Sequence, residues 1–76
     1  MTPNKFAPNR WPTRLVIEYA AVEAAKLGHF VPIRISAIED GERWACRCGR
    51  FATAIQVWPS GAHEGVCDEH LGEEPQ

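Results

Sequence analysis

Between residues 13 and 27, the apolar side chains of this chain recur at helical spacing. They form a stripe of moderate width that consists of Leu15, Val16, Tyr19, Val22 and Leu27. Alanines fill much of the remaining length, Pro12 stands at the entry, Thr13 is placed to cap the first turn, and Gly28 is placed to end the last one. The pattern predicts a helix over residues 13–27 whose apolar face packs on a sheet. An exposed helix that fills a groove on a partner is the alternative.

Alternating apolar and polar positions in the rest of the chain predict three short strands. The first is residues 30–38, and Pro32 confines it to a sheet edge or to a strand start. Asp40-Gly41 is a hairpin signal, so we expect residues 43–48 to return beside it as a second strand. Residues 51–58 form the clearest strand. The fold class is therefore α+β, with an N-terminal helix packed on a short antiparallel β-sheet.

The last predicted strand is followed by a turn, a return segment and a short helix. Phe51, Ile55 and Val57 share one face of the strand. After the return segment, a C-terminal helix is expected to begin near Cys67, and Gly72 limits it to a turn or two.

All three cysteines fall in two short segments, and a histidine fills the fourth place. The pattern is Cys46-Arg47-Cys48-Gly49, then seventeen residues, then Cys67-Asp68-Glu69-His70. On an extended strand Cys46 and Cys48 point to the same side, and Gly49 lets the chain turn behind them. Cys67 and His70 are three apart, which places them on one face of a helical turn. This is the spacing of a closed structural site that binds one Zn²⁺ through Cys46, Cys48, Cys67 and His70.

Two alternatives to this ligand set have to be weighed. Three cysteines cannot all pair within one chain, and a Cys46–Cys48 disulfide would close a very small, strained ring, so chance clustering of buried thiols is the remaining competitor. His63 lies four residues before Cys67 and would be the fourth ligand if that segment were helical. Pro59 and nearby glycines indicate a loop or hairpin there instead, which favours His70.

A chain of 76 residues allows one domain. Its small hydrophobic core gives only marginal stability without a metal site or another cross-link. We expect residues 1–11 to form an extended arm, residues 12–72 the zinc-binding domain with its zinc-finger part at 43–72, and residues 73–76 an acidic tail. A signal-peptide pattern and an apolar run of membrane-spanning length are both absent from the sequence. Together with cysteines free to bind metal, this predicts a cytoplasmic protein.

Charge is unevenly distributed along the chain. Residues 1–50 carry eight basic and five acidic side chains, whereas residues 51–76 carry five acidic and no basic ones. Arg43, Arg47 and Arg50 surround the first cysteine pair, where they offset the negative charge of zinc-bound thiolates. A more specific interpretation is that the same arginines form a nucleic-acid-binding face. Against it, the net charge of the chain is −2, whereas domains that bind nucleic acid are typically basic.

The order of these parts resembles a treble-clef zinc finger. Cys46-Arg47-Cys48-Gly49 resembles the zinc knuckle, residues 50–66 the β-hairpin, and Cys67-Asp68-Glu69-His70 the start of the last helix. The knuckle has one residue between its cysteines where two are commoner, and the last helix is short, so a zinc-ribbon-like arrangement is the other option. The whole resembles small zinc-binding proteins of bacterial or phage type. Such sites serve nucleic-acid binding, protein docking and, in one branch, nuclease chemistry.

The residues favour a non-enzymatic, zinc-binding protein-interaction module, of the kind that acts as a small regulator or inhibitor of a host enzyme. The expected contact residues are Trp11, Arg43, Arg47, Arg50 and Trp58, because tryptophan and arginine dominate interface hot spots. DNA or RNA binding through the three arginines is the alternative function. A nuclease would need a further histidine base and an open metal position, for which only the adjacent pair His63 and Glu64 is available. Neither a small-molecule substrate nor a membrane partner is indicated.

Overall fold

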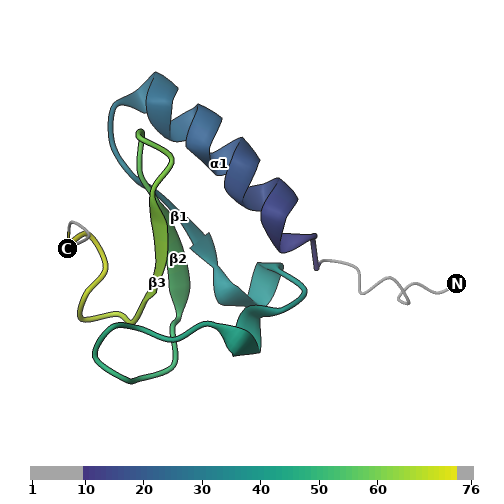
Figure 1. Ribbon diagram of the computed structural model, residues 1–76, viewed down its shortest axis with the longest axis vertical. Helices are drawn as coiled ribbons and strands as arrows, with labels where there is room; N and C mark the ends of the chain where they lie inside the picture. The colour runs from purple at the N-terminus through teal and green to yellow at the C-terminus, as the bar shows by residue number, and fades with distance from the viewer. Residues whose placement is uncertain (1–9, 74–76) are drawn as a thin grey trace, which may run out of the picture.

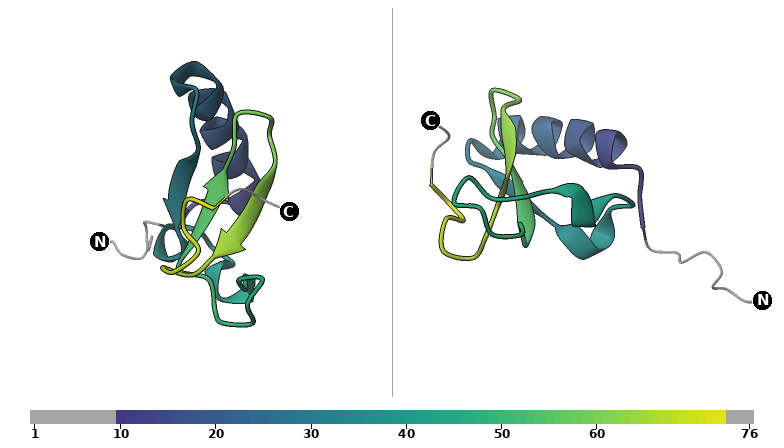
Figure 2. Two further views of the ribbon diagram at one scale, coloured as in Figure 1. Left: turned by 90° about the vertical axis from the view of Figure 1, so that its left-hand side faces the viewer. Right: turned by 60° about the horizontal axis from the view of Figure 1, so that its bottom comes forward.

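The computed structural model describes residues 10–73, in which one helix covers a three-stranded antiparallel sheet (Figure 1). The helix is α1 (Thr13–Leu27), and the strands are β1 (Val31–Arg34), β2 (Ala54–Val57) and β3 (His63–Val66). Their order in the sheet is β1-β2-β3, and α1 lies along one face of it (Figure 2). The predicted α+β class is confirmed. Most of the predicted arm, 1–11, and nearly all of the tail, 73–76, lie outside the described residues.

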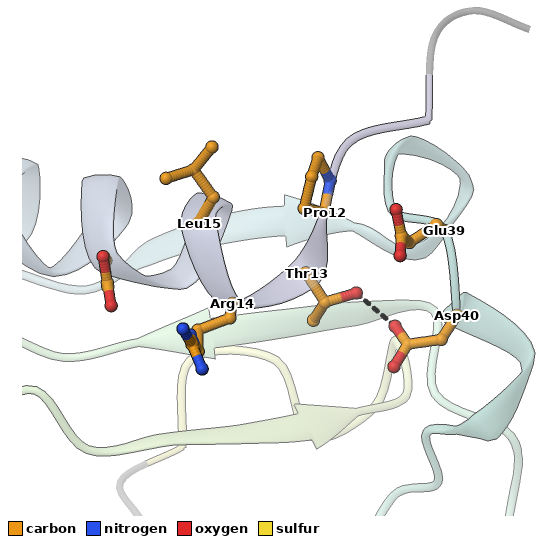
Figure 3. A pocket seen from close by; sticks show the side chains of 7 residues that line it. Pro12, Thr13, Arg14, Leu15, Glu39 and Asp40 are labelled. Atoms are coloured by element: carbon orange, nitrogen blue, oxygen red, sulfur yellow. Dashed lines mark hydrogen bonds between the residues drawn. The ribbon is translucent and has the colours of Figure 1, made fainter.

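Helix α1 begins and ends where the sequence predicts, but its first turn is built differently. Pro12 is the N-cap, and no side chain caps the free N–H groups of the first turn. The Thr13 hydroxyl instead donates to a carboxylate oxygen of Asp40, which ties the helix start to the loop after β1 (Figure 3). The predicted cap role of Thr13 is therefore wrong. Gly28 ends the helix in the left-handed conformation, with φ 81°, and its N–H donates to the carbonyl oxygen of Ala24.

The face that α1 turns to the sheet is not the predicted stripe. Ala20 and Ala24 are buried, with Val16, Ile17 and Ala21 packed against the core beside them. Small side chains let the helix lie close to the sheet, so the alanine face is the one that is buried. Most of the predicted stripe, including Leu15, Tyr19 and Val22, is exposed.

The main core lies between α1 and the sheet. Its buried members are Ala20, Ile33, Ile38, Ile55 and Val57. The register pairs Ile33 with Ile55 and Val31 with Val57, so the apolar side chains of β1 and β2 reach the helix together. Pro32 lies on β1, which is an edge strand as predicted.

The predicted hairpin between residues 30–38 and 43–48 is wrong. β1 pairs with β2, and the chain between them forms two short 3₁₀ helices, η2 (Ile35–Ala37) and η3 (Gly41–Arg43). Gly41 packs so tightly on Ile35 that a Cβ atom at Gly41 would lie 2.3 Å from the Ile35 carbonyl oxygen. This contact folds the chain back on itself instead of letting it run out as a strand.

Two further strand predictions need correction. Residues 43–48 contribute only an isolated bridge between Ala45 and Phe51. Phe51 itself lies outside β2 and is 80% exposed, so it does not share the core face with Ile55 and Val57.

The hairpin of β2 and β3 is present, and it carries a fully buried polar side chain, Gln56. The Gln56 amide donates to the Glu73 carbonyl oxygen at 2.6 Å and accepts from the Gly72 N–H at 2.9 Å. These bonds hold residues 68–73 against the sheet as successive turns, in which the His70 N–H donates to Cys67 and the Glu73 N–H to His70. The expected short C-terminal helix is therefore replaced by turns.

Candidate metal centre

The first ligand pair lies on a tight turn rather than on a strand. The Cys46 N–H donates to the Arg50 carbonyl oxygen at 2.8 Å, and the Gly49 N–H donates back to the Cys46 carbonyl oxygen at 2.9 Å. Gly49 has φ 96°, which an L-residue rarely adopts, so the glycine is needed for the turn. Both sulfurs lie on the same side of the chain, as predicted, but a tight turn and not an extended strand places them there.

The second pair follows directly from β3. Cys67 comes after the last residue of the strand, and His70 lies at the other end of the turn that the His70 N–H and the Cys67 carbonyl close at 3.0 Å. In Figure 1 this turn and the loop of residues 46–49 lie together at one end of the molecule. The antiparallel hairpin between them brings the two pairs to the same end.

Four ligand atoms, from Cys46, Cys48, Cys67 and His70, lie within 4.8 Å of one another. His70 Nδ1 is 3.2 Å from Cys67 Sγ and 3.4 Å from Cys46 Sγ, and Cys48 Sγ is 3.7 Å from Cys67 Sγ. These four residues are close enough to bind a metal ion. His63 is elsewhere: it is exposed on β3, and its Nδ1 lies 3.2 Å from the Gly61 carbonyl oxygen. The structure therefore brings His70, and not His63, to the three cysteines.

The site is buried on one side and open to solvent on the other. Cys46 and Cys67 are each 4% exposed and pack with Ala54 and Val66 in a second small cluster, whereas Cys48 is exposed. Ala54 and Val66 face each other across the hairpin, so β2 and β3 form the floor of the site.

The polar groups around the site shift the two buried thiols, but not Cys48 or His70, toward the forms that bind a metal ion. The backbone N–H of Cys48 lowers the pKa of the Cys46 thiol to about 6. The hydrogen bond between Cys67 and His70 lowers the pKa of the Cys67 thiol and raises the pKa of the His70 imidazole. The Arg50 N–H lowers the pKa of the Cys48 thiol, but desolvation and the sulfurs of Cys46 and Cys67 outweigh it, and the net shift is upward. Thiolates are what a metal ion requires, and Cys46 and Cys67 are shifted toward them.

Ion pairs join the two ligand segments around the site. Arg47, between the first two cysteines, lies 2.7 Å from Glu64 and 3.7 Å from Glu73. Arg50 lies 3.3 Å from Glu69, which stands between Cys67 and His70. The arginines were predicted to offset thiolate charge. Arg47 and Arg50 also pair with carboxylates, which was not predicted.

The predicted partner-binding residues do not share one environment. Trp11 is 59% exposed and is held by its backbone, which bonds to Ala37 and Glu39. Trp58 is half-buried and packs on Phe30 with ring centroids 5.1 Å apart. Arg43 is exposed at the end of η3, and Arg47 and Arg50 lie beside the metal site.

Two further groups, which were not predicted, support the site. Gln56 anchors the turn that carries His70, and Thr53 donates to Asp68 at 2.8 Å. A signal for Gln56 exists in the sequence, because an amide between Ile55 and Val57 interrupts an otherwise apolar run.

Comparison of the chain with protein-family models, with curated proteins and with solved structures found no match. Over residues 10–73, no helix has the length and apolar character needed to cross a bilayer.

Proposed function

We propose that Cys46, Cys48, Cys67 and His70 bind one structural Zn²⁺. A tetrahedron with Zn–S bonds of about 2.3 Å and a Zn–N bond of about 2.0 Å has S–S edges of about 3.8 Å and S–N edges of about 3.5 Å. The observed separations are 3.7 Å between Cys48 and Cys67, and 3.2 and 3.4 Å from His70 to Cys67 and Cys46. Three of the six edges are thus within about 0.3 Å of those of the tetrahedron, and all four atoms lie within 4.8 Å of one another, which is the observation that carries the proposal. Three thiolates and an imidazole are also a donor set that zinc prefers.

The zinc acts as a staple in this proposal and not as a reaction centre. Four protein ligands complete the tetrahedral coordination, whereas catalytic zinc sites keep one position for water or substrate. The order of knuckle, hairpin and returning pair supports a treble-clef-like arrangement. The turns that replace the last helix bring it nearer to the zinc-ribbon-like alternative.

The protein that this staple holds together is, we propose, a non-enzymatic interaction module, a small regulator or inhibitor that binds another protein. Trp11 supports this proposal, because a tryptophan that is 59% exposed is a typical interface anchor. Nucleic-acid binding through Arg43, Arg47 and Arg50 has weaker support, because two of these side chains already pair with glutamates. Binding of that kind would weaken steeply with salt.

The test combines metal analysis with partner capture. Protein purified from its native cell is expected to contain one zinc per chain, and Cys67→Ser to remove it. Trp11→Ala is expected to weaken capture of the protein partner while zinc content and helicity stay unchanged. Trp58→Ala is the matched control, because it also removes an indole, but one that is half-buried against Phe30. Folded protein without metal, or capture of nucleic acid that salt abolishes, would contradict the proposal.

A further inference from the structure

The outer face of α1 carries an exposed apolar stripe that the core does not use. It consists of Leu15, Tyr19 and Val22 on the helix, which are 45%, 72% and 57% exposed, together with Trp11, which precedes the helix and is 59% exposed. We call these four residues the outer stripe. Figure 2 shows no other described element crossing this side of the helix, and in Figure 3 Leu15 points away from Thr13 and Asp40. Three of these large apolar side chains recur at helical spacing, and an exposed stripe of this kind is expected to face another helix.

Two shallow hollows lie between these side chains. One hollow, of about 320 Å³, is lined by Leu15, Glu18, Tyr19 and Val22. These are positions i, i+3, i+4 and i+7, the four residues that form a hole for a side chain of a facing helix in knobs-into-holes packing. A second hollow, of about 500 Å³, lies one turn earlier and is lined by Trp11, Leu15, Val16 and Tyr19.

We propose that a second copy of this chain fills these hollows, with the two α1 helices antiparallel about a two-fold axis at the level of residue 17. In this register Leu15 of each copy enters the hollow between Leu15 and Val22 of the other. The same register places Tyr19 of each copy in the second hollow of the other, the one lined by Trp11, Leu15, Val16 and Tyr19. Both insertions occur at one offset between the helices, as a two-fold contact requires.

The charges beside the outer stripe fit the same register. Arg14 and Glu18 are exposed on one flank of the stripe, and neither has an ion pair within residues 10–73. A two-fold axis perpendicular to the helix pair brings this flank against the same flank of the other copy. Arg14 of each copy then faces Glu18 of the other, which gives two opposite-charge pairs per dimer.

The size of the contact indicates a weak dimer. A fully exposed large side chain offers at most on the order of 200 Å², so the outer stripe presents at most about 450 Å² and the pair would bury at most about 900 Å². Interfaces of this size are typical of weak association, and we expect a dissociation constant on the order of 10–100 μM.

The test is sedimentation equilibrium of the full zinc-loaded chain over a concentration range that spans this value. The wild type is expected to pass from monomer to dimer, and Tyr19→Glu to stay monomeric. Phe51→Glu is the matched control, because it makes the same kind of change at an aromatic residue that is 80% exposed outside α1. It should dimerise like the wild type.

Charge reversal tests the register. Arg14→Glu and Glu18→Arg should each weaken dimerisation at least about tenfold, because each creates two like-charge pairs. The double variant should restore it to within about threefold of the wild type. A protein that stays monomeric, a dimer that survives Tyr19→Glu, or a double variant without rescue would overturn the proposal. A monomer whose Tyr19 is shielded from a quencher would also overturn it, by showing that another part of the chain covers the stripe.

This inference goes beyond the proposed function, and because Trp11 has a role in both, Tyr19→Glu and not Trp11→Ala is the variant that separates them. A monomeric protein that binds one zinc and captures a different protein would contradict the proposed dimer alone. A dimer that folds without metal would contradict the proposed structural zinc alone.

Discussion

Replacement of His70 by alanine is the sharpest test of how this small domain is held together. The second cluster consists of Cys46, Ala54, Val66 and Cys67, so two of its four members are proposed metal ligands. Without metal, the loop and the C-terminal turns would be held to the sheet only by this small cluster, by the hydrogen bonds of Gln56 and Thr53, and by the ion pairs across the site. The ion pairs across the site are partly exposed and contribute at most about 1 kcal/mol each.

The magnitudes decide the expected outcome. Structural zinc contributes on the order of 10 kcal/mol of apparent folding free energy, whereas the core of a chain this short rarely supplies more than about 3–5 kcal/mol. Loss of the metal therefore exceeds what the main core can offset. We expect His70→Ala to reduce zinc affinity by more than about 100-fold and to be unfolded at zinc concentrations that keep the wild type folded.

The assay is a zinc titration against a competing chelator, followed by far-UV circular dichroism. His63→Ala is the matched control, because it removes an exposed imidazole of the same chain that lies outside the ligand set. It should bind zinc and fold like the wild type. If His70→Ala folded cooperatively without metal, or if His63→Ala were the variant that lost zinc, the reasoning would be wrong.

Three other substitutions test the packing around α1 and the site by urea unfolding of zinc-loaded protein. Asp40→Asn should cost about 1 kcal/mol at pH 7. The hydrogen bond from the Thr13 hydroxyl lowers the pKa of Asp40 from its usual value of 3.8, so the carboxylate stabilises the fold above that pH, and the difference in unfolding free energy from the wild type should narrow as the pH falls below it. Gln56→Leu should cost about 2–3 kcal/mol and speed hydrogen exchange at Gly72, whose N–H loses its acceptor; unchanged exchange would contradict this. Gly41→Ala should cost about 1–3 kcal/mol, because its Cβ would clash with the Ile35 backbone, whereas an unchanged midpoint would show that the turn can relax.

The sequence by itself determined the features that depend on local chemistry. The bounds of α1 follow from Pro12 at its entry, a run of helix-forming residues, and Gly28 at its end, all within one segment. The candidate ligand set followed in the same way from the spacing of the cysteines and His70. Gly49 likewise indicated the turn at the first cysteine pair, because that turn needs a residue that can adopt a positive φ.

Only the tertiary structure decided which surfaces meet. Side-chain hydrophobicity favoured Leu15 and Tyr19 as the buried face of α1, but the close approach of helix and sheet selects the small side chains of Ala20 and Ala24. The pairing of β1 with β2 was equally hidden, because it joins segments separated by the loop in which Gly41 packs against Ile35, and no local pattern marks it. Such choices depend on the shapes of segments far apart in the chain, and short-range patterns in a sequence carry no record of those shapes.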